Sequence, residues 1–497
     1  MTALDTAEAR LAGLETTANL AWWDMACEAT DATSAAAEAA SAALEHALAD
    51  PELAAITGDD RRAEVLHLMT AGRQRPPALI DRIVGLETEV MAAHSRYRAQ
   101  VGGRELDAAA VDDVLQRSAD EAEREAVWRA ARGVGAVVAP DLRELARLRN
   151  EGARALGHRD HYAMALALDE LDEDRLYAMF DELEAALAPA WATERAAIEA
   201  QRRAALGVDG PFQPWHMIDL FGQEAPSVGA DPLDGAIGAV DALAAASAYF
   251  ADLGHDVAGV VARSDLHPRP GKDQHAFMMH VDRRGDVRTL MNLTPTVRWL
   301  ETTLHELGHA IYELALDPDL PWLLRQPAHI LTTEAIAMLH GRRGRDAAFL
   351  ERYAGVPAAL AQDTVNAATQ RRALLILAQW VQVMTRFERA FYADPDGDLD
   401  AIWWDLVERH QGIPRPAVPL VDAWASKIHL GVAPCYYHNY LLGEILASQI
   451  DAWTTSGPEV AERLLRPGAS VRWDRLVEQA TGAPLGIAAF VADASRP

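Results

Sequence analysis

The sequence predicts a mostly helical protein with one short β-hairpin placed just before its most informative helix. Ala, Leu, Glu and Arg, which are strong helix formers, dominate the composition of the 497-residue chain. Apolar residues recur at helical spacing over long segments, and Pro and Gly residues punctuate the gaps. Half of the residues are hydrophobic, so a chain of this length can bury a large core and is not disordered.

Helical periodicity predicts seven long helices along the chain. They cover residues 6–49, 81–101, 119–156, 173–206, 236–253, 356–392 and 436–454. The most apolar stretch, residues 374–384, is interrupted by Gln379 and Gln382 and is too short to span a bilayer.

One segment departs from the helical pattern. Residues 275–293 read HAFMMHVDRRGDVRTLMNL, with β-favouring residues on both sides of Asp282-Arg283-Arg284-Gly285. Two such runs joined by a short polar segment that contains Gly predict a β-hairpin.

The charge of the chain excludes several classes of partner. Its 46 Lys and Arg against 74 Asp and Glu give a formal charge of −28. Nucleic acid and anionic membrane surfaces require a basic face, so neither is expected as a partner. Two cysteines, Cys27 and Cys435, are too few for a disulfide-stapled fold, and residues 1–20 lack the pattern of a signal peptide. We therefore expect a cytoplasmic protein.

A metal-binding motif follows the predicted hairpin. It reads His305-Glu306-Leu307-Gly308-His309, and side chains four positions apart share one face of a helix, so both imidazoles can point at one ion. Two neutral imidazoles suit Zn²⁺, which takes four ligands and keeps one position open for water in catalytic sites. Glu306 lies beside them and can reach that water as a general base. This spacing is the zinc-peptidase signature and predicts one Zn²⁺ per chain.

The third metal ligand is expected to be Glu334. It stands 25 positions after His309, at the start of another apolar-periodic helix. A loop with Pro318, Pro321 and Pro327 separates the two helices and lets the second return to the metal. Two plainer interpretations stay open. The motif can be a chance string on a surface helix, and Glu334 can be an acidic residue favoured by the helix dipole.

Around these motifs the sequence resembles the angiotensin-converting-enzyme family of zinc peptidases and, more distantly, the thimet oligopeptidase and oligoendopeptidase group. The match spans nearly the whole chain, and its landmarks occur in the family's order. They are NLAWWDMACEAT at residues 19–30, Trp128 through Asn150-Glu151-Gly152-Ala153-Arg154, Trp403-Trp404-Asp405-Leu406 with His410-Gln411-Gly412, and the zinc helix itself. The resemblance implies an all-α, two-lobed zincin with a deep channel between the lobes, in which peptides are cleaved.

The resemblance also implies how the chain is divided. It predicts one metallopeptidase domain over residues 1–497, made of two interleaved helical lobes. Residues 1–118 or so would form a helical lid region, and residues from about 119 to 497 would form the catalytic core with the zinc site.

Near the C-terminal end, the segment KIHLGVAPCYYHNYLLGEILASQI resembles the part of the family that completes the active site. His429 matches a His that, together with a Tyr, stabilises the tetrahedral oxyanion. Tyr440 matches that Tyr when the downstream helix is aligned to the oligoendopeptidase pattern, and Tyr437 then matches a Tyr that contacts substrate. Tyr436 replaces Tyr440 if the one-residue length difference lies elsewhere. The plain alternative for each is a core Tyr with a satisfied hydroxyl.

Other matched positions concern substrate binding. His275-Ala276-Phe277 resembles the family's edge strand, where a His and the following backbone pair with the substrate chain. Lys427, and with it Gln223, matches positions that receive the C-terminal carboxylate of the substrate. The plain alternatives are a solvated loop residue for His275 and a solvated surface charge for Lys427.

Two departures from the family pattern change what is expected. Met338 stands where the family has an acidic residue that supports a zinc-bound His, so this support must come from elsewhere, with Glu301 and Asp405 as candidates. Asn439 stands where the family has an Arg of a chloride site, so chloride activation does not follow from the resemblance.

The sequence thus predicts a zinc metallopeptidase of short peptides with Glu306 as general base. It releases C-terminal dipeptides if Lys427 and Gln223 hold the terminal carboxylate. Three alternatives remain: an oligoendopeptidase indifferent to the C-terminus, a zinc-stabilised peptide-binding protein without turnover, and a helical scaffold with a chance motif. The complete ligand set beside a general base argues against the binding protein, which needs no base.

Overall fold

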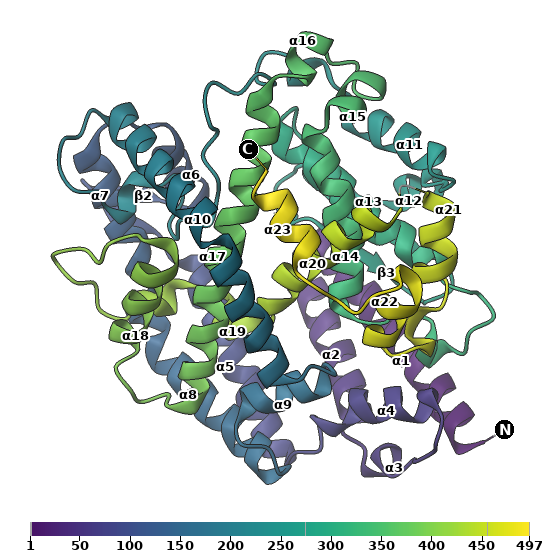
Figure 1. Cartoon of the computed structure of the whole chain (residues 1–497). Helices are drawn as coiled ribbons and strands as arrows, with labels where there is room; N and C mark the ends of the chain where they lie inside the picture. The colour runs from purple at the N-terminus through teal and green to yellow at the C-terminus, as the bar shows by residue number, and fades with distance from the viewer. Residues whose placement is uncertain (1, 274, 455, 497) are drawn as a thin grey trace. The chain divides into compact units, whose positions relative to one another are not determined.

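The chain is mostly helical, as the sequence predicts. A computed structural model describes residues 2–273, 275–454 and 456–496 (Figure 1). Helices make up 67% of the residues and strands 3%. Within the described ranges, no helix combines the length and the apolar character needed to cross a membrane.

The helices and strands form two compact units, each assembled from separate segments of the chain. Unit 1 contains Met1–Gln74, Gly229–Gln370 and Leu442–Phe490, and unit 2 contains Arg75–Val228, Arg371–Leu441 and Val491–Pro497. The expected division into a lid near residues 1–118 and a core near residues 119–497 stays a prediction.

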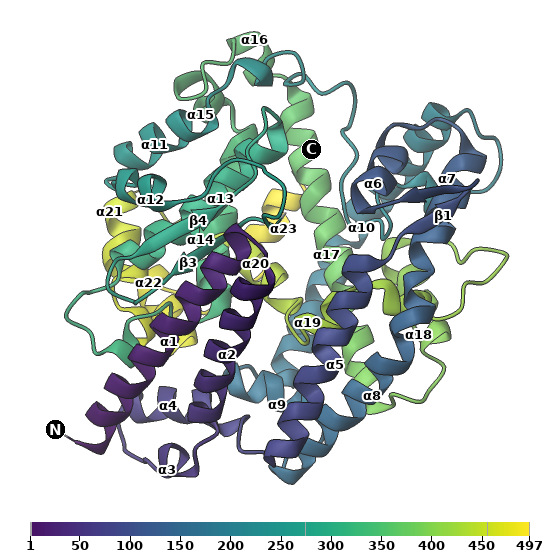
Figure 2. The ribbon, with the colours of Figure 1, turned by 180° about the vertical axis from the view of Figure 1, so that it is seen from behind.

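Unit 1 carries the metal motif and the predicted hairpin. Its elements are α1 (Ala3–Cys27), α2 (Asp31–Leu48), α3 (Pro51–Ala54), α4 (Arg61–Ala71), α11 (Ala242–Asp252), α12 (Ala258–Arg263), β3 (Phe277–His280), β4 (Val287–Leu290), α13 (Val297–Ala315), α14 (Ile330–Gly341), α15 (Ala347–Arg352), α16 (Ala358–Ala361), α21 (Gly457–Val460) and α22 (Trp473–Thr481). Helices α1 and α2 pack side by side (Figure 2).

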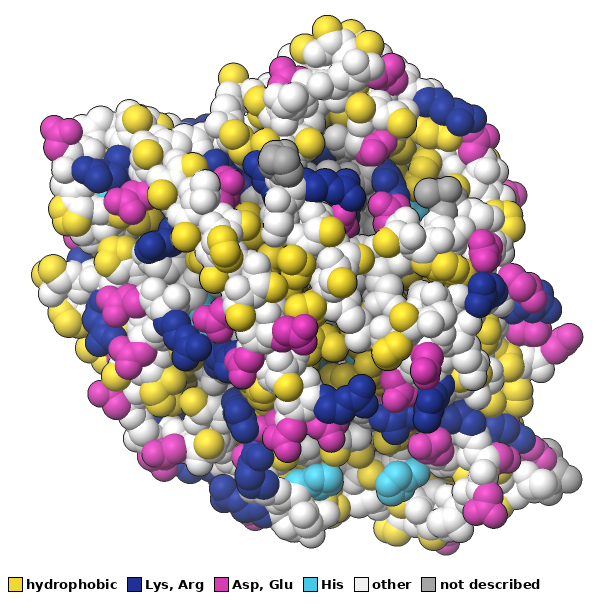
Figure 3. All heavy atoms as spheres, in the orientation of Figure 1, with side chains coloured by type: hydrophobic (Ala, Val, Ile, Leu, Met, Phe, Trp, Pro, Cys, Tyr) yellow, Lys and Arg dark blue, Asp and Glu magenta, His cyan; other side chains and the backbone are white. Residues whose placement is uncertain are grey.

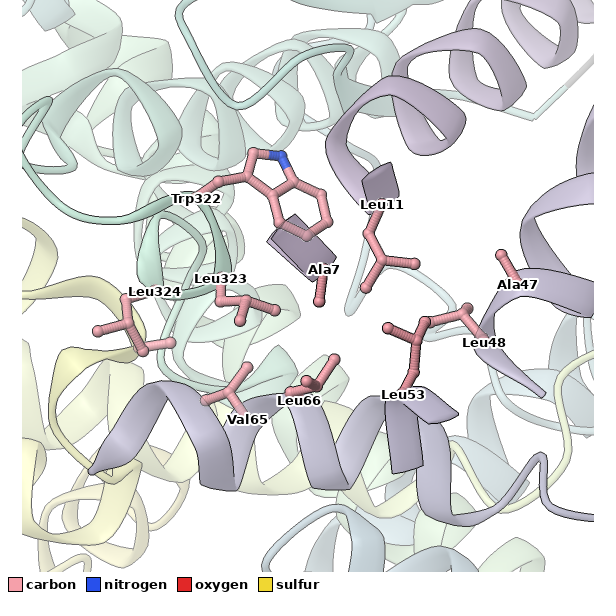
Figure 4. Packing of buried hydrophobic residues seen from close by; sticks show 11 residues of the cluster. Ala7, Leu11, Ala47, Leu48, Leu53, Val65, Leu66, Trp322, Leu323 and Leu324 are labelled. Atoms are coloured by element: carbon pink, nitrogen blue, oxygen red, sulfur yellow. The ribbon is translucent and has the colours of Figure 1, made fainter. Parts of the chain in front are cut away.

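A cluster of buried hydrophobic side chains fixes the loop between α13 and α14. It joins α1 and α4 to the 3-10 turn Trp322–Leu324, which lies in that loop (Figure 4). Leu11, Leu66 and Leu323 are fully buried in this cluster. The loop that returns the chain to α14 is therefore packed against the core, which restricts where α14 can begin.

The predicted hairpin before the metal motif is confirmed. Strands β3 and β4 pair antiparallel, from Phe277 opposite Leu290 to His280 opposite Val287. Trp22 of α1 packs on Phe277, with ring centroids 4.5 Å apart. In the connecting turn, Arg283 has a φ of 53°. Its guanidinium donates to both carboxylate oxygens of Glu15 in α1, at 2.7 and 2.8 Å. These two bonds connect the turn to that helix.

Unit 2 is built mainly from long helices. Its elements are α5 (Pro77–Arg96), β1 (Ala99–Val101), β2 (Arg104–Leu106), α6 (Ala108–Arg117), α7 (Glu121–Arg132), α8 (Val134–Ala155), α9 (His161–Leu168), α10 (Glu173–Leu206), α18 (Leu399–Leu406) and α19 (His429–Val432). Three helices contain residues of both units, namely α17 (Thr364–Ala393), α20 (His438–Trp453) and α23 (Ala488–Ala494).

The expectation of a single hairpin is wrong, because β1 and β2 form a second one. The helix predicted over residues 81–101 ends at Arg96, and the chain reverses at Gly102-Gly103, where both φ angles are positive. Glycine adopts this conformation without strain, and a Gly-Gly pair between two short strands is a hairpin signal. Helical periodicity upstream concealed that signal.

Four further helix predictions differ from the structure. The segment 119–156 is divided at Gly133 into α7 and α8, and the segment 356–392 is divided into α16 and α17. The segment 6–49 forms two helices, because the Thr30 side chain accepts a hydrogen bond from the first turn of α2 and so begins a new helix there. The segment 236–253 becomes an α-helix only after Asp241, whose carboxylate caps α11. In contrast, the prediction for residues 173–206 agrees with α10.

The surface mixes charges of both signs. On the face drawn in Figure 3, acidic and basic side chains are interspersed, with hydrophobic side chains between them. Many of the surface arginines form ion pairs, such as Arg73 with Glu45 at 2.8 Å. Such exposed pairs contribute little stability individually, so the fold depends mainly on its buried core.

Candidate metal centre and substrate-binding residues

The metal motif lies in the middle of α13, a helix with a well-defined start. The Thr296 side chain accepts a hydrogen bond from the Trp299 N–H at 3.2 Å, which satisfies one of the free donors of the first turn. A stripe of buried leucines turns one face of α13 to the core. His305 and His309 lie one turn apart on a neighbouring face, with ring centroids 4.8 Å apart. The helix therefore presents both imidazoles together.

Gly308 lets α13 and α14 approach closely (Figure 1). A Cβ atom at this position would stand 2.8 Å from the Cα atom of Ala337 and 3.2 Å from the carbonyl oxygen of Ile336. Any other residue would push the helices apart, so glycine is required by the close approach of the two backbones. Glu334 lies one turn before Ala337 on α14, and the crossing brings it to the two histidines.

His305, His309 and Glu334 form the candidate metal centre. One ligand atom from each lies within 4.8 Å of the others, and this is the one such group of three found in the residues that the structure describes. His305 Nε2 is 3.9 Å from a Glu334 oxygen. Tetrahedral zinc with ligands at about 2.0–2.1 Å separates them by roughly 3.3 Å. The donor set and its spacing therefore fit Zn²⁺ after a small adjustment.

The two imidazoles are held neutral. Burial lowers the pKa of His305 to about 4. Burial, with a smaller contribution from the neighbouring His305, lowers the pKa of His309 well below its ordinary value. A metal ligand must be the neutral imidazole, so the environment already favours the binding form. The His305 side chain is 29% exposed, which leaves the centre accessible from solvent.

Glu306 is buried beside the metal centre and contacts the hairpin. Its carboxylate accepts a hydrogen bond from the backbone N–H of Met278 in β3. Burial raises the pKa of Glu306 to about 8, the negative charge of Glu334 adds to the rise, and the Met278 hydrogen bond opposes it. The position of this carboxylate is therefore fixed from two sides, by α13 and by the strand.

Thr333 contacts a residue of the candidate metal centre, and the sequence pattern did not reveal it. Its hydroxyl is hydrogen-bonded to His309 Nδ1 at 2.7 Å, which leaves Nε2 of that ring for the metal. The two candidates proposed for this role are wrong. Glu301 instead forms an ion pair with Arg345 at 3.1 Å. Asp405, whose side chain is 73% exposed, forms an ion pair with Arg415 at 2.6 Å.

Met338 lies against α20. It stands where the resembled family has an acidic residue that supports a zinc-bound His. A Cβ atom at Gly443 of α20 would come within 3.3 Å of Met338 Sδ and 2.9 Å of Glu334 Cβ. A second glycine thus lets a helix backbone pack directly on the residue that carries the third ligand.

His275 and Ala276 precede β3 in unit 1. His275 is exposed, and its backbone N–H donates to Asp273 at 2.9 Å. Among the described strands, β3 pairs only with β4, so its other edge is not used by a strand. His280 is structural, as its ring joins Glu313 of α13 at 2.9 Å to the hairpin turn.

In unit 2, Lys427 and Gln223 meet inside an aromatic enclosure. Lys427 Nζ donates to the Gln223 side-chain oxygen at 2.9 Å. The ammonium lies 4.7 Å from the ring centre of Phe221, 5.3 Å from Trp380 and 5.5 Å from Tyr437. Burial lowers the pKa of Lys427 to about 8. The solvated surface charge considered for Lys427 is therefore excluded.

His429 and the tyrosines extend the same cluster in unit 2. The ring centroids of His429 and Tyr437 are 4.9 Å apart, and those of Tyr437 and Tyr440 are 5.4 Å apart. Tyr436 packs on Tyr440 at 5.1 Å. Tyr437 is buried, and the other three are half-buried. The structure thus collects the predicted residues into two groups, one in each unit.

Comparison with known proteins adds no further evidence for either group. The chain matches no model of a known protein family, and no curated protein matches it significantly.

Thr333 offers a direct test of how the metal centre is supported. We expect Thr333→Val to weaken zinc binding by about 10- to 100-fold, because the ring of His309 loses the hydrogen bond that orients it. Thr333→Ser keeps a hydroxyl and should stay close to wild type. Competition with a chromogenic chelator measures both constants. Equal zinc affinity in the valine variant would show that Thr333 does not orient the ligand.

Proposed function

We propose that this chain is a zinc-dependent metallopeptidase of the angiotensin-converting-enzyme type, a two-lobed zincin that hydrolyses short peptides and releases C-terminal dipeptides. The observation that carries the proposal is the convergence of His305, His309 and Glu334, with ligand atoms within 4.8 Å of one another. A structural zinc site is usually closed by four protein ligands, whereas a catalytic site has three and keeps one position open.

The position of Glu306 supports hydrolysis rather than metal storage. A buried carboxylate next to a buried ligand carboxylate is costly, and a protein that only stores zinc gains nothing from it. Glu306 and Glu334 are 6% and 5% exposed. In the proposed reaction, Glu306 accepts the proton of the attacking water and later delivers it to the leaving amine.

The edge of β3 is the proposed site for the substrate backbone. Met278 points its N–H at Glu306, on the side away from β4. Alternate residues of a strand turn their backbone groups to the same side, so Ala276 presents its N–H and C=O there as well. A peptide added along this edge would pair through main-chain hydrogen bonds and run past the general base.

The metal and the remaining side chains complete the proposed mechanism. When bound by the three ligands, zinc supplies Lewis acidity that polarises a carbonyl and makes water nucleophilic at neutral pH. His429 and Tyr440, with Tyr436 as the alternative to Tyr440, are the proposed hydrogen-bond donors to the developing oxyanion. Their assignment follows from the resemblance and stays a prediction.

Lys427 favours the release of dipeptides over cleavage that ignores the C-terminus. Within the described part of the chain, no carboxylate lies within 4 Å of its ammonium, and its side-chain partner is the neutral Gln223. A buried cation without a contacting counter-charge is costly unless a ligand supplies one. A substrate carboxylate would do so. An oligoendopeptidase that ignores the substrate C-terminus would give the buried ammonium of Lys427 no carboxylate to bind.

Replacement of the general base tests the proposed chemistry. We expect Glu306→Gln to lower kcat for a blocked peptide by about 10²- to 10⁴-fold, because the amide cannot accept the proton. Zinc content should remain one per chain, measured by plasma emission spectroscopy. Glu38→Gln, on the exposed face of α2, is the matched control. Full activity of the Glu306 variant with zinc in place would remove Glu306 from its assigned role.

Cleavage of peptides with and without a free C-terminal carboxylate distinguishes the dipeptide-releasing enzyme from the oligoendopeptidase. A peptide with a free C-terminus should be cleaved at least tenfold more efficiently, in kcat/KM, than its C-terminally amidated twin, because only the acid brings a carboxylate into contact with the Lys427 ammonium. Chromatography of the products measures both rates and shows whether a dipeptide is released. Equal rates would favour the oligoendopeptidase.

A further inference from the structure

The loop 219–224 in unit 2, which carries Gln223, is fixed by a buried carboxylate. Asp219 is 5% exposed and accepts hydrogen bonds from three backbone N–H groups of this loop. The donors are Phe221 at 2.8 Å, Gln223 at 3.2 Å and Glu224 at 3.0 Å. These bonds satisfy three backbone N–H groups of the loop and give Gln223 one backbone position.

The carbonyl groups of the same loop are held from outside it. Trp128 Nε1 donates to the Leu220 carbonyl oxygen at 3.0 Å. Gln411 Nε2 donates to the carbonyl oxygens of Phe221 and Gly222, at 2.9 Å each. A surface loop would leave these three carbonyl groups to water, so their bonds to side chains outside the loop indicate a loop whose geometry is set in advance.

Arg132 links this loop to the segment that carries Lys427. Its Nη1 donates to the Leu220 carbonyl oxygen and its Nη2 to the Ala423 carbonyl oxygen, both at 3.1 Å. Ala423 begins the 3-10 turn Ala423–Ser426, which ends directly before Lys427. One planar guanidinium therefore spans both segments and fixes their separation.

The surroundings of Arg132 hold the guanidinium rigidly. Arg132 is 2% exposed, and its charge lies 4.7 Å from the ring centre of Phe221, 5.4 Å from Trp128 and 5.6 Å from Trp403. Burial lowers the pKa of Arg132 to about 9, and attraction to Asp219 opposes this. Packing against aromatic faces suits a guanidinium better than an ammonium.

We propose that Arg132 is a positioning residue that sets the distance between Gln223 and Lys427 and thereby builds a pocket for the C-terminal carboxylate of a peptide. This inference rests on the proposed release of dipeptides. Arg132 contacts neither Gln223 nor the ligand and acts through the two backbone segments. Asp219 serves the same pocket by holding the loop closed.

Arg132→Lys tests this role because it keeps the charge and removes the planar fork. The ammonium can reach one of the two carbonyl groups but cannot span both in the same geometry. For a peptide acid we expect KM to rise about tenfold with kcat within twofold of wild type. For the amidated twin, neither constant should change. Arg117→Lys, the same substitution at a 78% exposed arginine of unit 2, should leave all four constants unchanged.

A binding measurement tests the role of Arg132 without requiring that the protein hydrolyses peptides. Calorimetric titration of the zinc-loaded full chain with the dipeptide Ala-Phe and with Ala-Phe amide should show about tenfold preference for the acid, and Arg132→Lys should lose it. If wild type binds both equally, the carboxylate pocket is refuted, whether or not peptides are hydrolysed. If the variant keeps the preference, the role of Arg132 is refuted while the proposed function stands.

Asp219→Asn provides a second variant if Arg132→Lys does not fold, as judged by circular dichroism. It replaces one accepting oxygen of the carboxylate with an amide donor, so the loop loses part of the bonding that holds it. We expect the same loss of preference for the acid. An unchanged preference in this variant would contradict the view that the loop sets the pocket.

Discussion

The close crossing of α13 and α14 is the constraint on which the metal centre depends. At Gly308 the two backbones are so near that a Cβ atom would overlap Ala337. Helix geometry alone aligns His305 with His309, but only this crossing places Glu334 beside them. Gly443 permits a similarly close approach of the α20 backbone to the Cβ atom of Glu334. Because packed helix interfaces are not continuously deformable, the packing of the helices holds His305, His309 and Glu334 together.

The sequence was most informative where one local rule decides the structure. The spacing of His305 and His309 predicts a shared face, and a proline-rich loop followed by a second helix predicts the return of Glu334. The hairpin at 277–290 follows from its alternating runs and turn residues. Where two local signals competed, as at Gly102-Gly103, the longer helical pattern concealed the shorter one.

Contacts between side chains and segments that lie far apart in the sequence could not be predicted from local patterns. Thr333 meets His309 only because the two helices cross at one particular residue, and no spacing in the sequence encodes that angle. Arg132 lies 88 positions before Leu220 and 291 before Ala423, so its bridge is invisible to any local pattern. Lys427, Gln223, His429 and the tyrosines were identified through the resemblance, and the structure gathers them in one cluster of unit 2.

The proposed activity requires three side chains of unit 1 to bind a single zinc ion and to leave one coordination position open for chemistry. Anomalous diffraction on either side of the zinc absorption edge, from crystals grown without added chelator, tests that claim most directly. The account predicts one strong peak within about 2.0–2.2 Å of both imidazoles and of the Glu334 carboxylate. The absence of a peak there, or a fourth protein ligand closing the site, would contradict it.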